Sequence, residues 1–408
     1  MSEITPDPYD IPLEEICLIA PGIWERNEIG PFLSRLREEA PVHWWENEEL
    51  GGYWSLTRYE DIKAVDTNPK VFSSQGSITI QDPEDDFNLP MFIAMDPPKH
   101  DEQRKVVSPT VAPSNIANLE GAIRQRVCTI LDSLPVGEEI DWVDLVSIEL
   151  TTQMLATLFD FPFEERRKLT RWSDIATSNE ESGTIESEAA RQAELLECLQ
   201  YFTALWEERK KKPGGFDLIS MLAHGEATQS MDPMEFLGNL VLLIVGGNDT
   251  TRNSISGGVL ALNQFPDQYQ KLRDNPAVIP NMVAEIVRWQ TPLSYMRRTA
   301  LEDTEIRGQK IREGDRVLMW YASGNRDESV FENADKLIVD RKNARHHLAF
   351  GFGIHRCMGN RLAEMQLRVL WEEIMKRFQT VEVVGEPERI RSSFVRGYKT
   401  LPVLLKAL

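Results

Sequence analysis

One cysteine stands in a setting that favours metal binding. Cys357 lies among glycines in the segment Phe350–Gly359 and comes just before Asn360–Arg377, where apolar residues recur at helical spacing. The free N–H groups and the dipole at a helix start lower the pKa of a cysteine there and favour the thiolate, which binds metals. The glycines would let the backbone approach a large flat group. Taken alone, however, a lone cysteine is more often a small buried residue.

The longest helical pattern contains a costly interruption. It runs from Pro233 to Gln264 and begins well, with Asp232 as N-cap, proline in first position and Glu235 placed to complete a capping box. At 1.5 Å per residue it would extend over about 48 Å, so it should be a central helix. Its middle reads Gly-Gly-Asn-Asp-Thr-Thr (Gly246–Thr251), in which each glycine costs about 1 kcal/mol relative to alanine. Such a cost suggests a function, and a phosphate loop is excluded because G-x-x-x-x-G-K-[ST] is absent.

Two further pairs place charged side chains on one helix face. Glu285 and Arg288 are three residues apart, and His100 and Arg104 are four residues apart. Most such pairs are solvated surface contacts, so neither pair alone indicates a site.

The periodicity predicts a mainly α fold with minor β. Short β-rich runs at Gly52–Ser55, Thr304–Ile306, Arg316–Met319 and Lys399–Leu405 are enough for small sheets at the margin. The segments with helical spacing are Ile116–Leu134, Asp144–Asp160, Glu188–Arg209, Pro233–Gln264, Asn281–Gln290 and Asn360–Arg377.

Composition narrows the class of protein. The 408 residues contain no evident linker, so we expect a single domain over residues 1–408. The net charge of −20 disfavours a nucleic-acid or anionic-membrane surface, which needs Lys and Arg. The acidic N-terminus does not resemble a signal peptide, and the longest apolar stretch, Leu240–Val245, is too short to span a membrane. We therefore expect a cytoplasmic protein.

The other candidate metal ligands are weak. Cys17, Cys128 and Cys198 lie far from one another and from Cys357, without C-x-x-C spacing, which argues against disulfides and a structural zinc site. The adjacent His346 and His347 would point in different directions and have no evident third ligand, so we interpret them as loop residues.

Four segments together resemble the cytochrome P450 family. Phe350–Gly359 fits the family's haem-loop pattern F-x-x-G-x-[HR]-x-C-x-G at every specified position. In the family's order, His100–Arg104 fits H-x-x-x-R, Gly246–Thr251 fits [AG]-G-x-[DE]-T-T, and Glu285–Arg288 fits E-x-x-R. The resemblance covers Ala94 to the C-terminal region, about three quarters of the chain.

This resemblance implies the mostly helical P450 fold, with haem b buried between the Pro233 helix and the Cys357 helix. Cys357 would bind the haem iron, and Asp249 and Thr250 would relay protons to iron-bound dioxygen. The other implied haem contacts are Phe350, Gly351 and Gly359 beside the cysteine, and His100, Arg104, Arg298 and His355 around the propionates. The implied structural brace of the loop before the cysteine is Glu285, Arg288 and Arg341.

The implied reaction is insertion of one oxygen atom from O2 into a C–H bond, because a thiolate ligand promotes O–O cleavage. No G-x-G-x-x-G motif or iron–sulfur spacing is present, so electrons must come from partners. The resemblance implies a ferredoxin and an NAD(P)H-dependent ferredoxin reductase. Arg345, Arg356 and Arg361 could meet an acidic ferredoxin.

Three runs, Phe92–His100, Val245–Ser254 and Met319–Asp327, resemble the bacterial subfamily that hydroxylates alkanes and fatty acids at the terminal carbon. The rival interpretation is a steroid or terpenoid hydroxylase with a wider pocket. By family position the candidate substrate contacts, each of which could equally be core, are Met91, Leu242, Val245, Gly246, Leu293 and Val395.

Two interpretations from other classes are a peroxygenase or a non-oxygenating haem-thiolate enzyme, and a haem sensor. The first would not need the Asp249–Thr250 relay, and the second would usually carry a signalling module, of which the sequence shows none.

Overall fold

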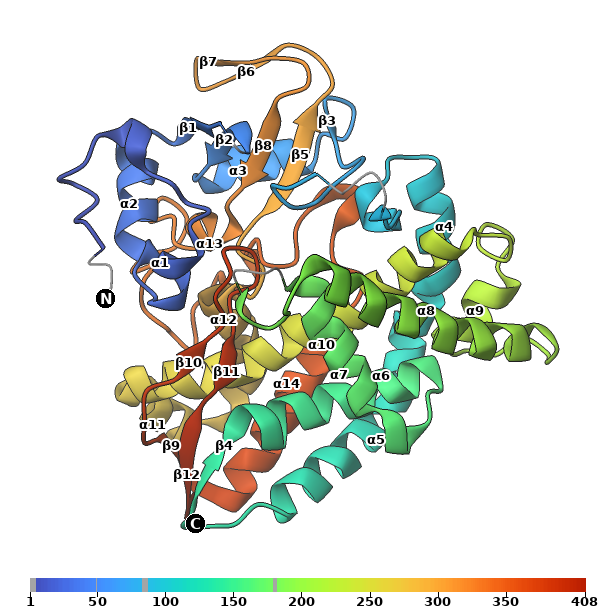
Figure 1. Ribbon diagram of the computed structural model, residues 1–408. Coiled ribbons are helices and arrows are strands. Elements are labelled where there is room, and N and C mark those ends of the chain that lie inside the picture. The colour runs from blue at the N-terminus through green and yellow to red at the C-terminus, as the bar shows by residue number, and fades with distance from the viewer. Residues whose placement is uncertain (1–4, 49, 83–86, 179–181) are drawn as a thin grey trace.

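Helices form most of the protein and surround one long helix, α10 (Figure 1). The computed structural model describes residues 5–48, 50–82, 87–178 and 182–408. The helices are α1 (Pro21–Glu25), α2 (Ile29–Glu39), α3 (Tyr59–Asp66), α4 (Lys99–Val107), α5 (Pro113–Asp132), α6 (Glu149–Phe159), α7 (Arg167–Thr177), α8 (Glu188–Lys210), α9 (Leu218–His224), α10 (Pro233–Gln264), α11 (Pro266–Asp274), α12 (Ile279–Gln290), α13 (Tyr321–Gly324) and α14 (Asn360–Arg377).

The central helix begins and ends where the sequence predicts. The Asp232 carboxylate accepts hydrogen bonds from the backbone N–H groups of Met234 (2.9 Å) and Glu235 (3.0 Å), which would otherwise lack partners. The predicted capping box is wrong in one respect: Glu235 pairs with Lys99 (2.7 Å) and accepts from Gln103, so it joins α10 to α4.

Two apolar clusters meet on α10. Its N-terminal half packs with α8 and α9, through residues such as Leu237 and Leu240. Its C-terminal half packs with α5, α12 and α14, through residues such as Ile255 and Val259. The helix therefore passes through the core, and the Gly246–Thr251 segment lies where the two clusters meet.

The strands form small sheets, as predicted. The largest has the order β1-β2-β8-β5-β3 and lies at one end of the molecule, with α5 at the other (Figure 1). The strands are β1 (Val42–Asn47), β2 (Gly51–Leu56), β3 (Phe72–Ser73), β4 (Glu139–Asp141), β5 (Met296–Ala300), β6 (Thr304–Ile306), β7 (Gln309–Ile311), β8 (Arg316–Met319), β9 (Phe378–Val383), β10 (Glu388–Arg389), β11 (Tyr398–Thr400) and β12 (Pro402–Ala407).

Some boundaries differ from the prediction. The expected helix Asp144–Asp160 consists of a π-helical turn, Val143–Ile148, followed by α6. The expected strand Lys399–Leu405 is divided between β11 and β12, which join different sheets. Within the described ranges, no helix is long and apolar enough to cross a membrane.

Candidate functional site

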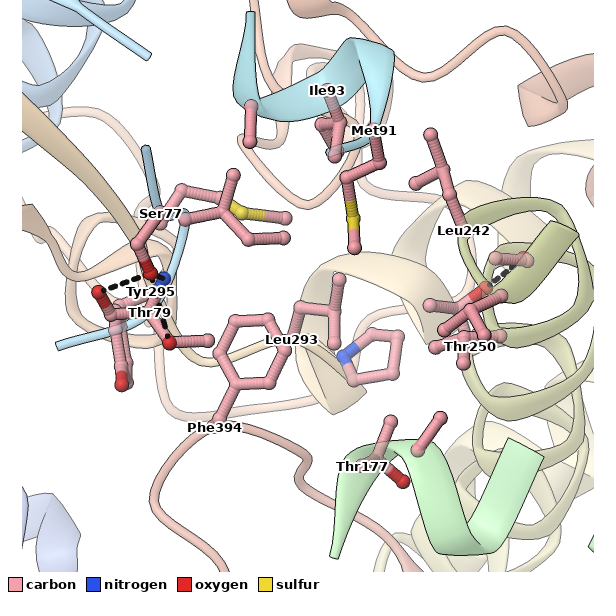
Figure 2. A pocket seen from close by; sticks show the side chains of 18 of the residues that line it. Ser77, Thr79, Met91, Ile93, Thr177, Leu242, Thr250, Leu293, Tyr295 and Phe394 are labelled. Carbon is pink, nitrogen blue, oxygen red and sulfur yellow. Dashed lines mark hydrogen bonds between the residues drawn. The ribbon is translucent and has the colours of Figure 1, made fainter. Parts of the chain in front are cut away.

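A cavity of about 1370 Å³ lies between α10 and the loop that carries Cys357. One wall includes Gly246 and Thr250 of α10, and the opposite side includes Phe350, Gly351 and Cys357. Figure 2 shows part of the lining, with Thr250 on one side. The structure thus brings together residues that are at least 100 positions apart in the sequence.

The loop before α14 holds the cysteine in a defined position. The N–H of Cys357 donates to the carbonyl of Phe350 (2.7 Å), which closes the loop. Gly351 and Gly353 both have φ of +63°, a conformation that favours glycine. At Gly359, an added Cβ would meet the Cys357 sulfur at 4.0 Å, so this glycine lies directly beside the thiol. The expected cysteine loop is therefore present, and its thiol faces the cavity.

We expected the helix start to lower the pKa of Cys357, and this expectation is wrong for the protein without a metal. The N–H groups of Gly359 and Asn360 and the charges of Arg104 and Arg356 do lower it. Removal of the thiol from bulk water outweighs these effects, and the pKa is raised above its ordinary value. The helix start by itself does not supply a thiolate.

The four predicted propionate contacts lie near one another. Arg104, Arg298 and His355 line the cavity, whereas His100 packs behind His355 with ring centroids 4.2 Å apart. Arg104 donates to the carbonyl of Arg356. Nε2 of His100 and both ring nitrogens of His355 are buried and have no hydrogen-bond partner among the described residues.

The α10 glycines have different surroundings. A Cβ at Gly246 would meet nothing within 4 Å, so this residue faces open space in the cavity. A Cβ at Gly247 would come within 2.6 Å of Leu155, so this glycine allows α6 to pack closely. The α10 backbone remains helical throughout this segment, and the Thr250 hydroxyl donates to the Gly246 carbonyl (3.0 Å). The hydroxyl oxygen can still accept a hydrogen bond from the cavity.

Asp249 points away from the cavity, toward α7. Its carboxylate is fully buried, pairs with Arg252 (3.0 Å) and accepts from the Ser173 hydroxyl (3.0 Å). It also accepts from the hydroxyl of Thr177 (3.2 Å), and Thr177 itself lines the cavity (Figure 2). Arg252 pairs in addition with Asp174 (2.6 Å), whose side chain is 36% exposed. We call Asp249, Arg252, Asp174, Ser173 and Thr177 the Asp249 cluster.

Glu285, Arg288 and Arg341 form a second buried set, the Glu285 cluster. Glu285 accepts from Arg288 (2.7 Å) and Arg341 (2.9 Å). The side chains of Glu285 and Arg288, both on α12, are 0% exposed. The remaining donors of the two arginines reach backbone carbonyls between Asn325 and Lys336. The structure brings these three residues together as expected, and none of them lines the cavity.

Five of the six expected substrate contacts line the cavity: Met91, Leu242, Val245, Gly246 and Leu293. The sixth, Val395, does not. It is 2% exposed and forms a bridge with Leu293, while its neighbour Phe394 faces the cavity (Figure 2). Successive residues of an extended segment point to opposite sides, so a prediction that is wrong by one position names a core residue in place of a lining residue.

Sequence reasoning missed several lining residues. They include Ile93 beside Met91, Tyr295 beside the Leu293 position, and the hydroxyl-bearing Ser77 and Thr79 (Figure 2). These residues lie in connecting segments without a periodic pattern. Only the fold brings them to the cavity.

The arginines expected at the docking surface are exposed near the cysteine loop. Arg345, Arg356 and Arg361 are all exposed. Arg345 forms a loose pair with Glu364 (3.4 Å) and donates to the carbonyl of Pro280 (3.3 Å). His347 is buried beside Phe350. Within the described part of the chain, no group of three or more histidine, cysteine or acidic side chains is arranged to hold a metal ion.

The residues around the cavity fit a haem. The thiol of Cys357 faces the space, and Gly246 leaves the opposite wall flat. The guanidinium groups of Arg104 and Arg298 provide donors at one edge, as two carboxylates would require, and the unpartnered ring nitrogens of His100 and His355 lie beside them.

Comparisons with known proteins agree with this geometry. The family model "Cytochrome P450" matches residues 185–404. The structure of CYP153D17 from Sphingomonas sp. PAMC 26605 has a TM-score of 0.90 and 52% identity, covering 95% of this chain and 98% of that one. Linalool 8-monooxygenase from Pseudomonas putida is 38% identical, covering 94% of this chain and 97% of the relative. The methyl-branched lipid omega-hydroxylase from Mycobacterium bovis (strain ATCC BAA-935 / AF2122/97) is 35% identical, covering 98% and 96%.

The match to the family model covers more than half of the chain, and the relatives match over nearly their whole length. Together with the fold and the cavity, this similarity decides the class of enzyme. The chain belongs to the cytochrome P450 family and is a monooxygenase whose cofactor is haem b.

Proposed function

We propose that Cys357 binds the haem iron and that the enzyme hydroxylates the terminal carbon of medium-chain alkanes or fatty acids. The assignment of the ligand is supported by the thiol facing the cavity and by the closed loop around it. Arg104, Arg298, His355 and, behind it, His100 would hold the propionates. Phe350, Gly351 and Gly359 would shape the loop next to the iron.

Bound haem supplies the oxygen chemistry, in which O2, two electrons and two protons convert a C–H bond to an alcohol and water. The protein must deliver the protons. Asp249 does not line the cavity, so its proton would pass through the Thr177 hydroxyl, which touches both the carboxylate and the cavity. The Thr250 hydroxyl, bonded to Gly246, would orient a cavity water beside the iron.

The apolar part of the cavity lining is the single observation that carries the substrate proposal. Met91, Leu242, Leu293 and Phe394 present only hydrocarbon, sulfur or aromatic surface to the cavity (Figure 2). Such a wall can hold an unactivated chain end by burial alone, since each buried CH2 contributes about 0.8 kcal/mol. The resemblance to alkane and fatty-acid hydroxylases and the lipid omega-hydroxylase relative favour the same class.

A substrate panel tests this proposal. Octane, dodecanoic acid, linalool and a steroid are each added to the purified ferric protein, and the spectral change that accompanies loss of water from the iron is titrated. Products formed with a surrogate ferredoxin and reductase are then identified. Terminal alcohols from the linear compounds, at the lowest half-saturating concentrations, are expected. Turnover only of linalool or the steroid would contradict the proposal.

The alternative, a terpenoid or steroid hydroxylase, is favoured by one finding, the similarity to linalool 8-monooxygenase. Leu293→Ala distinguishes the two classes. In a terpenoid or steroid hydroxylase the pocket is already wide enough, so this change should leave oxidation of the bulky substrate nearly unchanged. In an alkane or fatty-acid hydroxylase the pocket is narrow, so widening it should reduce the selectivity for the terminal carbon of a linear chain.

We also propose that electrons come from a ferredoxin, supplied by an NAD(P)H-dependent reductase, that docks on Arg345, Arg356 and Arg361. Charge reversal at Arg345 and Arg361 should reduce ferredoxin-driven turnover and its dependence on salt. The matched control is Lys310→Glu on the exposed β7 strand of the distant β6–β7 hairpin. Equal effects of the two changes would rule out this surface.

The ligand assignment has its own test, independent of substrate. Cys357→His should abolish the red-shifted carbon-monoxide band of the reduced protein, because that band depends on thiolate ligation. Persistence of the band would eliminate Cys357 as the ligand.

A further inference from the structure

A buried carboxylate at the cavity wall has no role in the reaction described above. Asp66 is the last residue of α3, and its side chain is 1% exposed. It lines the cavity on the side of Arg298 and Gly351. Burying an ionised carboxylate is costly unless it is paired and hydrogen-bonded, so its partners should explain why it is retained.

Three donors from three separate elements converge on Asp66. Its Oδ1 accepts from Nη2 of Arg298 on β5 (2.7 Å). Its Oδ2 accepts from the backbone N–H of Phe352 in the cysteine loop (2.7 Å) and from the hydroxyl of Tyr321 on α13 (3.0 Å). One carboxylate therefore joins α3 to an arginine of the haem site and to the loop that carries Cys357.

The backbone confirms that this contact is built into the loop. A Cβ at Gly353 would lie 2.5 Å from the carbonyl oxygen of Asp66, too close for any side chain. A Cβ at Gly351 would lie 3.2 Å from Oδ2 of the same residue. Both glycines have positive φ, so the loop is shaped to rest against the end of α3.

Arg298 differs from His100 in the burial of its acidic partner. His100 contacts Asp101, whose side chain is 62% exposed, whereas Arg298 and Asp66 are 4% and 1% exposed. Arg298 is also held by its own chain, since Nη1 donates to the carbonyl of Arg297 (2.8 Å). Its guanidinium is therefore fixed before any haem binds, with its charge balanced by a buried neighbour.

We propose that Asp66 is a positioning residue for haem: it orients Arg298 and the Cys357 loop, and its negative charge holds down the reduction potential of the iron. This inference rests on the haem site proposed above. Reduction adds one electron to the haem, and a fixed negative charge in a low-dielectric wall disfavours that addition. Without Asp66, the positive charge of Arg298 would be unbalanced, and the reduced form would be favoured.

Asp66→Asn tests both parts, because it keeps the shape and removes the charge. The purified holoprotein is titrated spectroelectrochemically, and the rate of haem transfer to excess apomyoglobin is measured. A positive shift of the midpoint potential and a haem loss at least about tenfold faster are expected, the latter equivalent to one lost charge-assisted hydrogen bond. An unchanged potential with unchanged haem loss would overturn the proposal.

The control is Asp327, a buried carboxylate outside α3 that contacts the start of this helix. Asp327 has a side chain that is 1% exposed, pairs with Arg58 (2.8 Å) and accepts from the N–H of Tyr59 (2.9 Å), but does not line the cavity. Asp327→Asn should lower thermal stability without moving the potential. A shift equal to that of Asp66→Asn would mean that loosening α3, and not the charge of Asp66, is responsible.

A second variant keeps the test decisive if Asp66→Asn fails to fold. Tyr321→Phe removes one donor and leaves the carboxylate, so its negative charge is less well compensated and the potential should move to more negative values. No shift, or a positive one, would contradict the proposal. The carbon-monoxide band distinguishes failure of the Asp66 proposal from failure of the ligand assignment. If the band keeps its position in these variants but the potential does not shift as expected, the Asp66 proposal is wrong and the assignment of Cys357 stands.

Discussion

The Glu285 cluster and the Asp249 cluster both combine a buried carboxylate with arginine, but their outermost groups contact different surroundings. In the Glu285 cluster, the donors of Arg288 and Arg341 that do not reach Glu285 reach backbone carbonyls. In the Asp249 cluster, Arg252 leads to the partly exposed Asp174 on one side. On the other side, Asp249 leads through Thr177 to the cavity.

This difference distinguishes a cluster that only holds elements together, the brace, from a cluster that connects to the cavity, the path. A carboxylate whose partners are all fixed protein groups can only hold elements together, and removing it leaves buried charges without compensation. A carboxylate that is connected to a cavity through a hydroxyl group can pass a proton toward that cavity. The same residue types therefore give a structural role in one place and, as we propose, a catalytic one in the other.

Breaking the brace should have the largest effect. Glu285→Gln leaves Arg288 and Arg341 without their carboxylate, so we expect the free energy of unfolding to fall by about 3–5 kcal/mol. Denaturant unfolding and the yield of folded holoprotein measure this loss. Glu305→Gln on the exposed side of β6 is the control. A change within about 0.5 kcal/mol, as for a surface residue, would refute the assignment.

Breaking the path should spare stability and reduce the reaction. Asp249→Asn keeps the size of the side chain, and Arg252 keeps its pair with Asp174, so the fold should persist. Without the acid, we expect the hydroxylation rate to fall about 100-fold. The measurement is product formed per NAD(P)H consumed, together with the rate. An undiminished rate would show that protons arrive by another route.

A smaller change tests whether the path includes Thr177. Thr177→Val removes the hydroxyl that links Asp249 to the cavity, and we expect about a tenfold lower rate, equivalent to roughly 1.4 kcal/mol. Thr177→Ser should restore most of it. Thr157→Val on α6 is a matched control, because both hydroxyls donate to the carbonyl four residues earlier but only Thr177 lines the cavity. Equal losses in the two valine variants would exclude the relay.

The smallest expected effect is a change in stability with pH that arises from His347, which feels the charge of Arg288 in the Glu285 cluster. Burial, followed by the charges of Arg288, Arg356 and Arg345, lowers the pKa of His347 to about 3. Below its ordinary value of 6.5, the unfolded chain binds a proton that the folded protein does not, so stability falls as pH falls. Between pH 7 and 6 this contributes about 0.7 kcal/mol of lost stability.

Unfolding of the haem-free protein at both pH values measures this contribution. His347→Gln should flatten the pH dependence, whereas His346→Gln, at an exposed position, should leave it unchanged. An identical dependence in all three proteins would mean that His347 is protonated in the fold.

The sequence predicted what local pattern encodes. The bounds of α10 and α14 follow from periodicity, and the helical spacing puts Glu285 beside Arg288. The contact of Glu285 with Arg341 was expected only because the resemblance to the cytochrome P450 family implies it. What it could not predict depends on long-range geometry. The direction of Asp249 is decided by α7, and the burial that raises the pKa of Cys357 is decided by the packed loop. Asp66 has no motif of its own, since its three donors lie 232 to 286 residues away along the chain.

The origin of the cavity lining bears on how such an enzyme can diversify. The apolar side chains of the cavity lining come from separate segments, and Ile93, Leu293 and Phe394 lie in short connections outside α10 and α14. These connections lie outside the cysteine loop and both charge clusters, so substitutions in them change the lining while the residues of those sites stay the same. A lineage can thus exchange one substrate for another in small, separately viable steps. Relatives that share more than a third of this sequence and are named for linalool and for methyl-branched lipids are the outcome that such an arrangement would produce.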